Sequence, residues 1–463
     1  MASGTQIPRV VIGGGSSGAG KTTATVALIG ALRGRGLTVA PFKCGPDYLD
    51  PSYHARAAGR TSHNLDGWMM GREAAIATFV RASRDADIAV IEGMMGLYDG
   101  ATPTSEEGST AEIAKWLGAP VLLTIDAGGI ARSVGAIAGG FAGFDREVRL
   151  AGVLCNRVGG QGHLDLLRAA STEIPVVGGL PQNSAAAFPE RHLGLFSADE
   201  SNVPAESIEA WGRIAAEWFD LDAILAIARG TPALAPAEAE ASLSRPARPR
   251  CRIGVAYDEA FHFYYEYNLA LLQALGAEIE RFSPAHDPEL PRVDGLYFGG
   301  GYPEIAAPAL SSNRAMLAAV RDFAHRGSPV YAECGGLMYL AEGIRALDGR
   351  SFPMAGVIPG QAVMRDRLQA LGYAEVETRA PSMLGPAGTR WRGHQFRYSV
   401  LEPAPPLEFE RLFTVVPRWG GEAFNEGYRT GNVVASYVHA HWASNPAVAA
   451  AFVSACASAQ SRT

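Results

Sequence analysis

The stretch RVVIGGGSSGAGKTT, Arg9 to Thr23, decides the fold of the first half of the chain. An apolar run ends in a glycine-rich turn that reads G-x-x-x-x-G-K-T, with Gly15, Gly20, Lys21 and Thr22 at the defining positions. A helical pattern follows directly. Small residues let successive backbone N–H groups curl around phosphates, and the start of a helix adds partial positive charge. The sequence therefore predicts a phosphate-binding loop (a P-loop) between a strand and a helix.

The roles expected in this loop follow from ATP chemistry. Lys21 is predicted to reach the β- and γ-phosphates, and the Thr22 hydroxyl is predicted to coordinate Mg²⁺. The alternative is a fortuitous glycine-rich turn. The full set of predicted ATP-binding residues is Gly15, Gly18, Gly20, Lys21, Thr22, Thr23, Lys43 and Asn156, the last as a hydrogen-bonding partner of adenine.

Apolar runs alternate with helix-length patterns through the first half of the chain, which indicates βαβ units and a mostly parallel sheet. The runs are Arg9–Gly15, Leu37–Lys43, Asp87–Gly93, Ala119–Ala127, Arg149–Arg157 and Ile174–Pro181. A second alternation begins at Arg252, and the last third of the chain has the character of antiparallel strands. The stretch between them is rich in Ala and Pro, which is typical of a linker. We expect an ATP-binding domain at 1–230, a linker at 231–250, a second α/β domain at 251–446 and a tail at 447–463.

Composition limits the classes of function. With 463 residues the chain is long enough for two or three domains, and its net charge of −7 argues against a nucleic-acid-binding surface. Its five cysteines show no CxxC spacing, so neither a zinc site nor a disulfide framework is indicated. No apolar segment reaches the roughly 20 residues that span a bilayer, and the first residues do not resemble a signal peptide. We expect a cytoplasmic protein with small-molecule partners, and with neither nucleic acid nor membrane among its partners.

Acidic residues follow two of the predicted strands of the first domain. Glu92 ends one apolar run, with Asp99 shortly after it, and FKCGPDYLDPSYH places Lys43, Asp47 and Tyr48 behind another. The carboxyl ends of parallel strands meet at one edge of a sheet, where phosphate and Mg²⁺ bind. Thr22, Asp47 and Glu92 are therefore the expected metal ligands, and the Asp47 loop is expected to face a carboxylate substrate. The alternative is that these acids only cap turns.

The stretch PVYAECGGLMYL, Pro329 to Leu340, places Cys334 where an apolar run meets two glycines. A sharp turn there would aim the sulfur at a cleft, although free cysteine is also a common packing residue. The run YFGGGYPE and the Gly335 N–H are candidates for stabilising an oxyanion, through Gly300, Gly301 and Gly335. Two histidines lie in SYVHAHWASNP, His439 and His441. Together these residues predict nucleophilic acyl transfer by a cysteine.

The two halves together predict the formation of an amide. A thiol that hydrolyses glutamine releases ammonia, and ATP activates a carboxylate as an acyl phosphate that ammonia then attacks. Ammonia is expected to travel between the domains, shielded from water.

Six motifs, in this order, resemble the cobyrinate a,c-diamide synthases and their hydrogenobyrinate counterparts: KCGPDYLDPSYH, NLDGWM, EGMMGLYDG, PERHLGL, ECGGLMYL and YVHAHWASNP. The resemblance implies an N-terminal domain like dethiobiotin synthetase and a C-terminal domain like class I glutamine amidotransferases. It implies that the a and c acetate carboxylates of a corrin ring are amidated in turn, with ATP, Mg²⁺ and glutamine, in cobalamin biosynthesis. It also suggests a homodimer.

The resemblance assigns roles residue by residue. Cys334 becomes the glutaminase nucleophile and His439 its base, and Asp47, Tyr48, Leu49 and Asp99 surround the substrate. Many related glutaminases carry a Glu two residues after this histidine, where this chain has His441, so no third triad member is nominated. The family usually has GHEFHYS where this chain has GHQFRYS, so the roles of Gln395 and Arg397 stay open.

Three other functions compete with cobyrinate amidation. The same chemistry fits metal-free hydrogenobyrinate or another tetrapyrrole such as nickel sirohydrochlorin. A P-loop switch or partitioning ATPase is a more distant alternative, because such proteins commonly have a signature lysine where this chain has Ser16 and Ser17. The third is a binding module in which Cys334 is inert.

Overall fold

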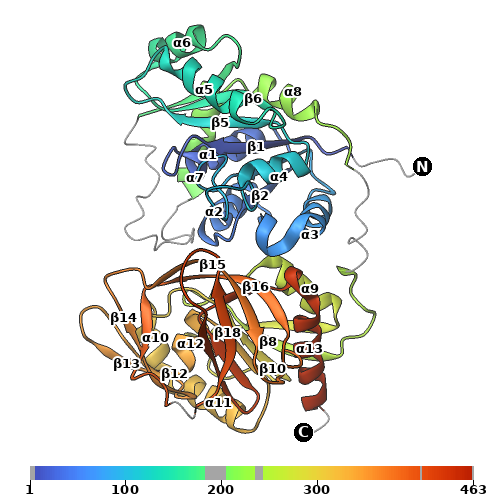
Figure 1. The fold of residues 1–463 in the computed structure, drawn as a ribbon, viewed down its shortest axis with the longest axis vertical. Coiled ribbons are helices and arrows are strands. Elements are labelled where there is room, and N and C mark those ends of the chain that lie inside the picture. The colour runs from blue at the N-terminus through green and yellow to red at the C-terminus, as the bar shows by residue number, and fades with distance from the viewer. Residues whose placement is uncertain (1–5, 183–204, 235–242, 407–408, 461–463) are drawn as a thin grey trace. The chain divides into compact units, whose positions relative to one another are not determined.

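The computed structural model describes residues 6–182, 205–234, 243–406 and 409–460. It divides into two compact units, Met1–Glu240 and Ala241–Thr463, each with its own sheet (Figure 1). The motif PERHLGL, Pro189 to Leu195, and part of the predicted linker lie outside the described residues. Within the described ranges, no helix combines the length and apolar character needed to cross a membrane.

The first unit is a seven-stranded sheet with the strand order β3-β2-β4-β1-β5-β6-β7, and every neighbouring pair is parallel. Its strands are β1 Arg9–Gly14, β2 Val39–Cys44, β3 His63–Leu65, β4 Ile88–Glu92, β5 Val121–Asp126, β6 Leu150–Val158 and β7 Val176–Pro181. Its helices are α1 Lys21–Gly34, α2 Leu49–Ala58, α3 Gly67–Ala82, α4 Thr110–Trp116, α5 Ser133–Phe144, α6 Gln161–Ala170, α7 Ala205–Trp218 and α8 Leu221–Arg229. The predicted parallel α/β domain is confirmed, and the short strand β3 was not predicted.

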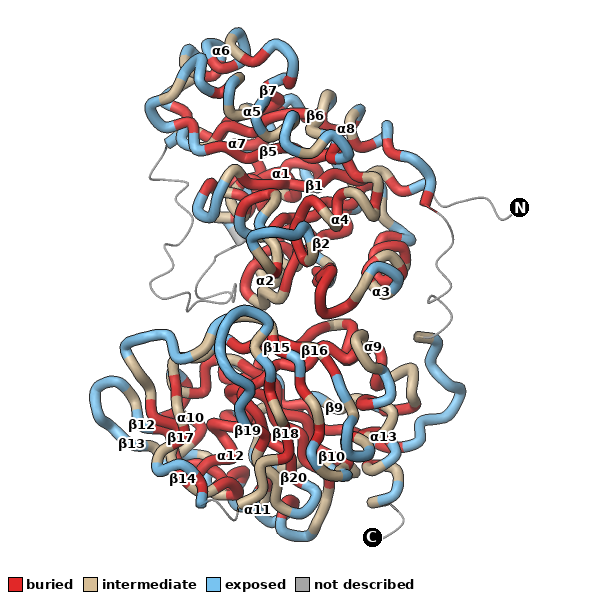
Figure 2. The backbone as a smooth tube through the Cα atoms, in the orientation of Figure 1, coloured by how far each residue is buried: buried red, intermediate tan, exposed pale blue. Residues whose placement is uncertain are grey.

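Helices cover both faces of this sheet, which explains why its strands are apolar without alternation. In β1, Val10 and Ile12 pack under α1, α2, α7 and α8, whereas Val11 packs under the helices of the opposite face. The strands are therefore buried along almost their whole length (Figure 2). The carboxyl ends of β1, β2 and β4 lie side by side.

The second unit contains two sheets. Its strands are β8 Cys251–Ala256, β9 Ala277–Phe282, β10 Gly295–Phe298, β11 Val330–Glu333, β12 Ala341–Arg345, β13 Ser351–Pro353, β14 Ile358–Met364, β15 Ala370–Thr378, β16 Arg390–Arg397, β17 Ser399–Glu402, β18 Arg411–Pro417, β19 Phe424–Thr430, β20 Val433–Ser436 and β21 His439–His441. Its helices are α9 Glu266–Ala274, α10 Ala307–Ser312, α11 Arg314–His325, α12 Gly335–Leu340, α13 Pro446–Gln460 and the 3₁₀ turn η3 Trp442–Ser444.

The larger sheet has the order β21-β16-β15-β18-β19-β20-β11-β10-β8-β9. Strands β9, β8, β10, β11 and β20 pair in parallel, and the remaining neighbours pair antiparallel, as expected for the last third of the chain. β17 belongs to the smaller sheet, β13-β12-β14-β17, so the stretch His394–Glu402 splits between two sheets.

The chain departs from the expected domain plan at two places. Residues 447–463 were expected to form a tail, but α13 runs to Gln460 and buries Val448, Phe452 and Cys456 against β8 and α9. The expected linker begins at Thr231, yet this side chain is buried and its hydroxyl bonds to the Ala228 carbonyl.

Helix α1, which carries the P-loop lysine, is held in place by close contact with α7. A Cβ atom placed on Gly212 would lie 2.9 Å from the backbone carbon of Gly30. Only glycine permits this approach of two helix backbones.

We predict that Gly212→Ala lowers the unfolding free energy of the first unit by roughly 1–3 kcal/mol, because a methyl group must push α7 away from α1. The control is Gly140→Ala in α5, where a Cβ meets nothing within 4 Å. That change should stabilise the unit by about 0.5–1 kcal/mol. Denaturant unfolding measures both, and equal effects would contradict the prediction.

Candidate active sites

The P-loop joins β1 to α1 in a conformation that requires glycine at Gly20. Its φ is 96°, and a Cβ there would overlap the Asn156 side-chain amide. Asn156 Nδ2 donates to the Ala19 carbonyl at 3.2 Å, so this side chain lies against the end of the loop. Its predicted contact with adenine stays a prediction.

Lys21 lies folded over the loop rather than extended into solvent. Its Nζ donates to the Met95 carbonyl at 2.5 Å and to the Ser16 carbonyl at 3.2 Å. Burial lowers the pKa of Lys21, with Lys43 acting in the same direction. Met95 has φ 44°, an uncommon conformation for a residue with a side chain, and its carbonyl faces the lysine. A phosphate would offer Lys21 better acceptors than these two carbonyls.

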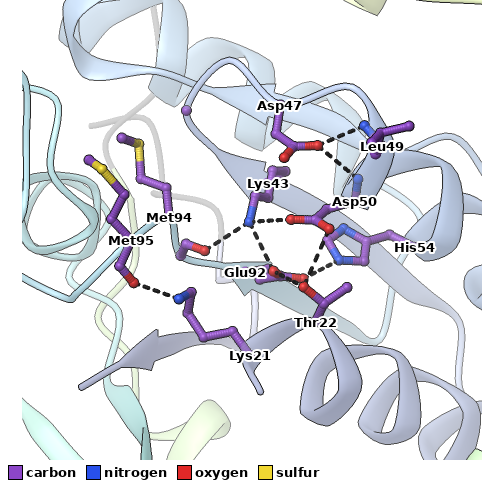
Figure 3. Close-up of polar contacts among 12 residues, drawn as sticks. Lys21, Thr22, Lys43, Asp47, Leu49, Asp50, His54, Glu92, Met94 and Met95 are labelled. Atoms are coloured by element: carbon purple, nitrogen blue, oxygen red, sulfur yellow. Dashed lines mark hydrogen bonds and ion pairs between the residues drawn. The ribbon is translucent and has the colours of Figure 1, made fainter. Parts of the chain in front are cut away.

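A cluster of buried charges lies beside the loop, where β2 and β4 end (Figure 3). Lys43 Nζ lies 2.7 Å from Asp50 Oδ2 and 2.9 Å from Glu92 Oε1. Thr22 Oγ1 donates to Glu92 Oε1 at 2.8 Å and lies 3.3 Å from Asp50 Oδ1. Lys43, Asp50 and Glu92 are at most 5% exposed in their side chains. Burial alone would lower the pKa of Lys43, but the attraction of Asp50 and Glu92 outweighs it and raises this pKa.

Three acidic residues near the P-loop have different contacts, and the expected metal-binding role of Asp47 stays a prediction. Asp47 Oδ1 accepts hydrogen bonds from Leu49 N at 2.7 Å and Asp50 N at 2.9 Å, so this carboxylate oxygen caps α2. The carboxylate that lies beside Thr22 and shares Lys43 with Glu92 is that of Asp50. Asp99 Oδ2 accepts from Gly96 N at 2.8 Å and so closes the turn after β4.

Sequence reasoning also missed His54, whose Nε2 lies 2.5 Å from Glu92 Oε2 with neither side chain exposed. Asp50 and His54 are four residues apart in α2, and such a pair shares one helix face. That spacing was the signal available in the sequence. Tyr48 precedes the first residue of α2, and Leu49 begins the helix and is buried.

Within the described residues, no group of three or more His, Cys, Asp or Glu side chains forms a metal site by itself. Thr22, Asp50 and Glu92 nevertheless bring a hydroxyl and two carboxylates together. Mg²⁺ prefers oxygen ligands and commonly combines one or two carboxylates with water and substrate phosphates. The residues present therefore fit Mg²⁺ bound together with a nucleotide.

Cys334 occupies a sharp corner between β11 and α12, as the sequence predicts. Its φ is 47° and its ψ is −100°, a strained backbone conformation for a residue with a side chain. Cys334 N donates to the Ser436 carbonyl at 2.7 Å, which holds the corner against β20. Strained strand-to-helix turns of this kind present nucleophiles in other enzymes.

Contacts of the glycine run bring the other predicted residues of this half together. A Cβ on Gly300 would overlap the ring of His439, and a Cβ on Gly335 would lie 3.1 Å from Gly301 N. Gly336 N also donates to the Gly299 carbonyl at 3.0 Å. The glycine run therefore contacts both the His439 ring and the backbone directly after Cys334. Their assignment to an oxyanion site stays a prediction.

Burial sets the proton state of this corner. It raises the pKa of the Cys334 thiol to about 12, with a contribution from Glu304, while Arg397 acts in the opposite direction. Burial lowers the pKa of His439 to about 3. At neutral pH the resting pair is therefore a neutral thiol and a neutral imidazole. An imidazole in this form is able to accept a proton when the sulfur attacks.

His441 follows His439 on β21 but has different neighbours. Its ring packs against Tyr265 and Tyr267, and its Nε2 has no hydrogen-bond partner in the described part of the chain. The His439 ring stacks instead on His394, at 4.9 Å between centroids.

The two departures from the family motif lie close to this corner. Gln395 is buried, and its Nε2 has no partner among the residues that the structure describes. Arg397 stacks over Tyr437 at 4.4 Å and donates to the Ser399 carbonyl at 2.6 Å.

Comparison with known proteins agrees with this division into two sites. Residues 10–195 match the family described as "CobQ/CobB/MinD/ParA nucleotide binding domain". Residues 252–447 match the "CobB/CobQ-like glutamine amidotransferase domain".

Curated relatives match nearly the whole chain. The cobyrinate a,c-diamide synthase of Leptospira interrogans serovar copenhageni is 51% identical over 97% of this chain and 99% of its own length. That of Syntrophotalea carbinolica is 48% identical over 97% and 98%. The hydrogenobyrinate a,c-diamide synthase of Streptomyces coelicolor is 42% identical over 98% of both chains. This chain therefore belongs to the cobyrinate and hydrogenobyrinate a,c-diamide synthase family, and it is a glutamine-dependent, amide-forming ligase.

Proposed function

We propose that this enzyme uses ATP, Mg²⁺ and glutamine to amidate the a and c acetate carboxylates of cobyrinate in cobalamin biosynthesis. The observation that carries the proposal is that one chain contains both a P-loop beside buried carboxylates and a cysteine corner beside a glycine run and a histidine. The first fits carboxylate activation and the second fits release of ammonia. The names of relatives that match nearly the whole chain supply the substrate.

The C-terminal unit would release ammonia from glutamine. His439 accepts the thiol proton as Cys334 Sγ attacks the amide carbon, and the C–N bond breaks as His439 returns this proton to the leaving nitrogen. Water then hydrolyses the thioester to give glutamate. Backbone N–H groups of Gly301 and Gly335 are the proposed donors to the oxyanion.

The N-terminal unit would activate the substrate carboxylate. The P-loop amides and Lys21 hold the ATP phosphates, while Lys43 contacts the Asp50 and Glu92 carboxylates and holds them in place. Thr22, Asp50 and Glu92 would hold Mg²⁺, which neutralises phosphate charge when bound. The carboxylate oxygen attacks the γ-phosphorus and ADP leaves. Ammonia then attacks the acyl carbon and displaces phosphate.

The substrate carboxylate would bind beside α2 and the turn after β4. Tyr48 directly precedes α2, Leu49 begins it, and Asp99 follows β4. With Asp47 as the cap of α2, its proposed role is to fix this loop around the substrate.

We predict that Cys334→Ala abolishes glutamine-dependent amidation but retains amidation with added ammonium, because only the release of ammonia needs the thiol. Product formation with each nitrogen source measures this. Cys155→Ala is the control, since Cys155 lies on β6 of the other unit and should leave both activities intact. Loss of both activities in Cys334→Ala would contradict separate sites.

We predict that Lys43→Met lowers the unfolding free energy of the first unit by roughly 3–5 kcal/mol, because two buried carboxylates lose their cation. Added Mg²⁺ should restore part of this stability, since it takes the same carboxylates. Lys115→Met is the control: Lys115 also contacts acids, but these are more exposed, and its loss should cost about 1 kcal/mol or less without Mg²⁺ dependence. Denaturant unfolding measures both variants. Equal losses of unfolding free energy, with the same response to Mg²⁺, would be evidence against a magnesium site.

The relative from Streptomyces coelicolor makes hydrogenobyrinate the second candidate substrate. Because the cobyrinate synthases include the relatives of higher identity, we expect kcat/KM to be at least tenfold higher with the cobalt-containing macrocycle. Steady-state assays with both macrocycles decide this. A higher kcat/KM with the metal-free ring would make hydrogenobyrinate the first candidate substrate. Inactivity on both macrocycles would overturn the proposed substrate.

A further inference from the structure

The residue before Cys334 is a buried acid with a set of contacts that the proposed chemistry does not use. Glu333 is 1% exposed and ends β11. Its Oε1 accepts from Tyr331 OH at 2.8 Å and from Ala440 N at 3.0 Å, and its Oε2 accepts from Tyr297 OH at 3.0 Å. All of these groups are buried.

These contacts connect the three chain segments that carry the proposed glutaminase residues. Glu333 is directly before the nucleophile, and Ala440 is directly after His439. Tyr297 lies on β10, which leads into the glycine run. One carboxylate therefore bonds to the cysteine strand, the histidine strand and the strand before the oxyanion candidates.

The hydrogen bond from Ala440 N ties β21 directly to the side chain at the end of β11. β21 pairs only with β16, at the edge of the sheet, and β20 pairs with β11. The hydrogen bond from Ala440 N to Glu333 thus bridges strands that are far apart in the sheet order. Without it, the backbone next to His439 loses a direct connection to the cysteine corner.

We propose that Glu333 is a positioning residue of the glutaminase site, one that sets the geometry of Cys334, His439 and the glycine run through its three hydrogen bonds. The inference rests on the proposed function of that site. It also accounts for the absence of an acid at position 441, because the structural support of the base comes instead from a carboxylate at the end of β11, which bonds to the backbone directly after His439. Glu333 contacts the backbone and not the His439 ring, so it acts through other residues.

Hydrogen bonding rather than charge is the expected basis of this role. Burial raises the pKa of Glu333 to about 7, although the Ala440 N–H and the two tyrosine hydroxyls act in the opposite direction. A neutral group of the same shape is therefore compatible with this position. Glutamine retains a carbonyl oxygen for Ala440 N and an amide group that pairs with a tyrosine hydroxyl.

The test measures glutamine hydrolysis by the full-length enzyme as separate kcat and KM values. We expect Glu333→Ala to lower kcat about 100-fold with KM changed less than about threefold, a split that reflects misplaced reacting groups. Glu333→Gln should recover kcat to within about fivefold of the unmodified enzyme. Ammonium-dependent amidation should stay unchanged in both.

A second pair of variants covers the case in which Glu333→Ala does not fold. Tyr297→Phe combined with Tyr331→Phe removes two donors and leaves the Ala440 contact, so kcat should fall by roughly 3–10-fold. Asn313→Ala is the structural control, because Asn313 makes three hydrogen bonds around the start of α11. It should lower the melting temperature without changing kcat.

The outcomes separate this inference from the proposed function. If the unmodified enzyme hydrolyses glutamine and Cys334→Ala does not, the glutaminase assignment stands. The positioning role is then overturned if Glu333→Ala or the double Tyr variant keeps full kcat. It is also overturned if Glu333→Gln is as defective as Glu333→Ala. If the unmodified enzyme does not hydrolyse glutamine, both proposals fall together.

Discussion

A carboxylate that is buried without partners is costly, and this constraint organises both sites of the protein. Glu92 ends β4 and Glu333 ends β11, each at the carboxyl end of a central parallel strand and each almost fully buried. Lys43, Thr22 and His54 converge on the first. Two tyrosines and a backbone amide converge on the second. In satisfying the acid, each group of partners also fixes the loops from which the reacting groups project.

The two sites nevertheless use different electrostatics. The Glu92 cluster brings Lys43 close to Asp50 and Glu92. Its charges suit the binding of phosphate and a divalent cation. The Cys334 corner has neutral resting groups, because burial opposes charge on both the thiol and the imidazole. A site for phosphoryl transfer needs charged side chains at rest, because they offset the negative charge of ATP. A site for amide cleavage needs only to move a proton during the reaction. The difference in composition therefore agrees with the chemistry proposed for each half.

Local patterns in the sequence were sufficient for the P-loop, the parallel sheet and the cysteine corner, since each depends on residues that are neighbours in the chain. Contacts between segments that are distant in the sequence were harder to predict. Asp47 was expected to bind metal, but the sequence alone does not show which of two acids near a helix start becomes its cap. His54 and Glu333 were within quoted motifs, yet their partners come from strands far away in sequence. The split of His394–Glu402 between two sheets also depends on tertiary pairing that no local period reveals.

Burial of the Cys334 thiol affects how readily its sulfur is oxidised. Peroxide oxidises thiolates far faster than protonated thiols. A buried sulfur that stays protonated is therefore a poor target for peroxide. As the proposed nucleophile, a thiol in this form would resist irreversible oxidative damage between turnovers.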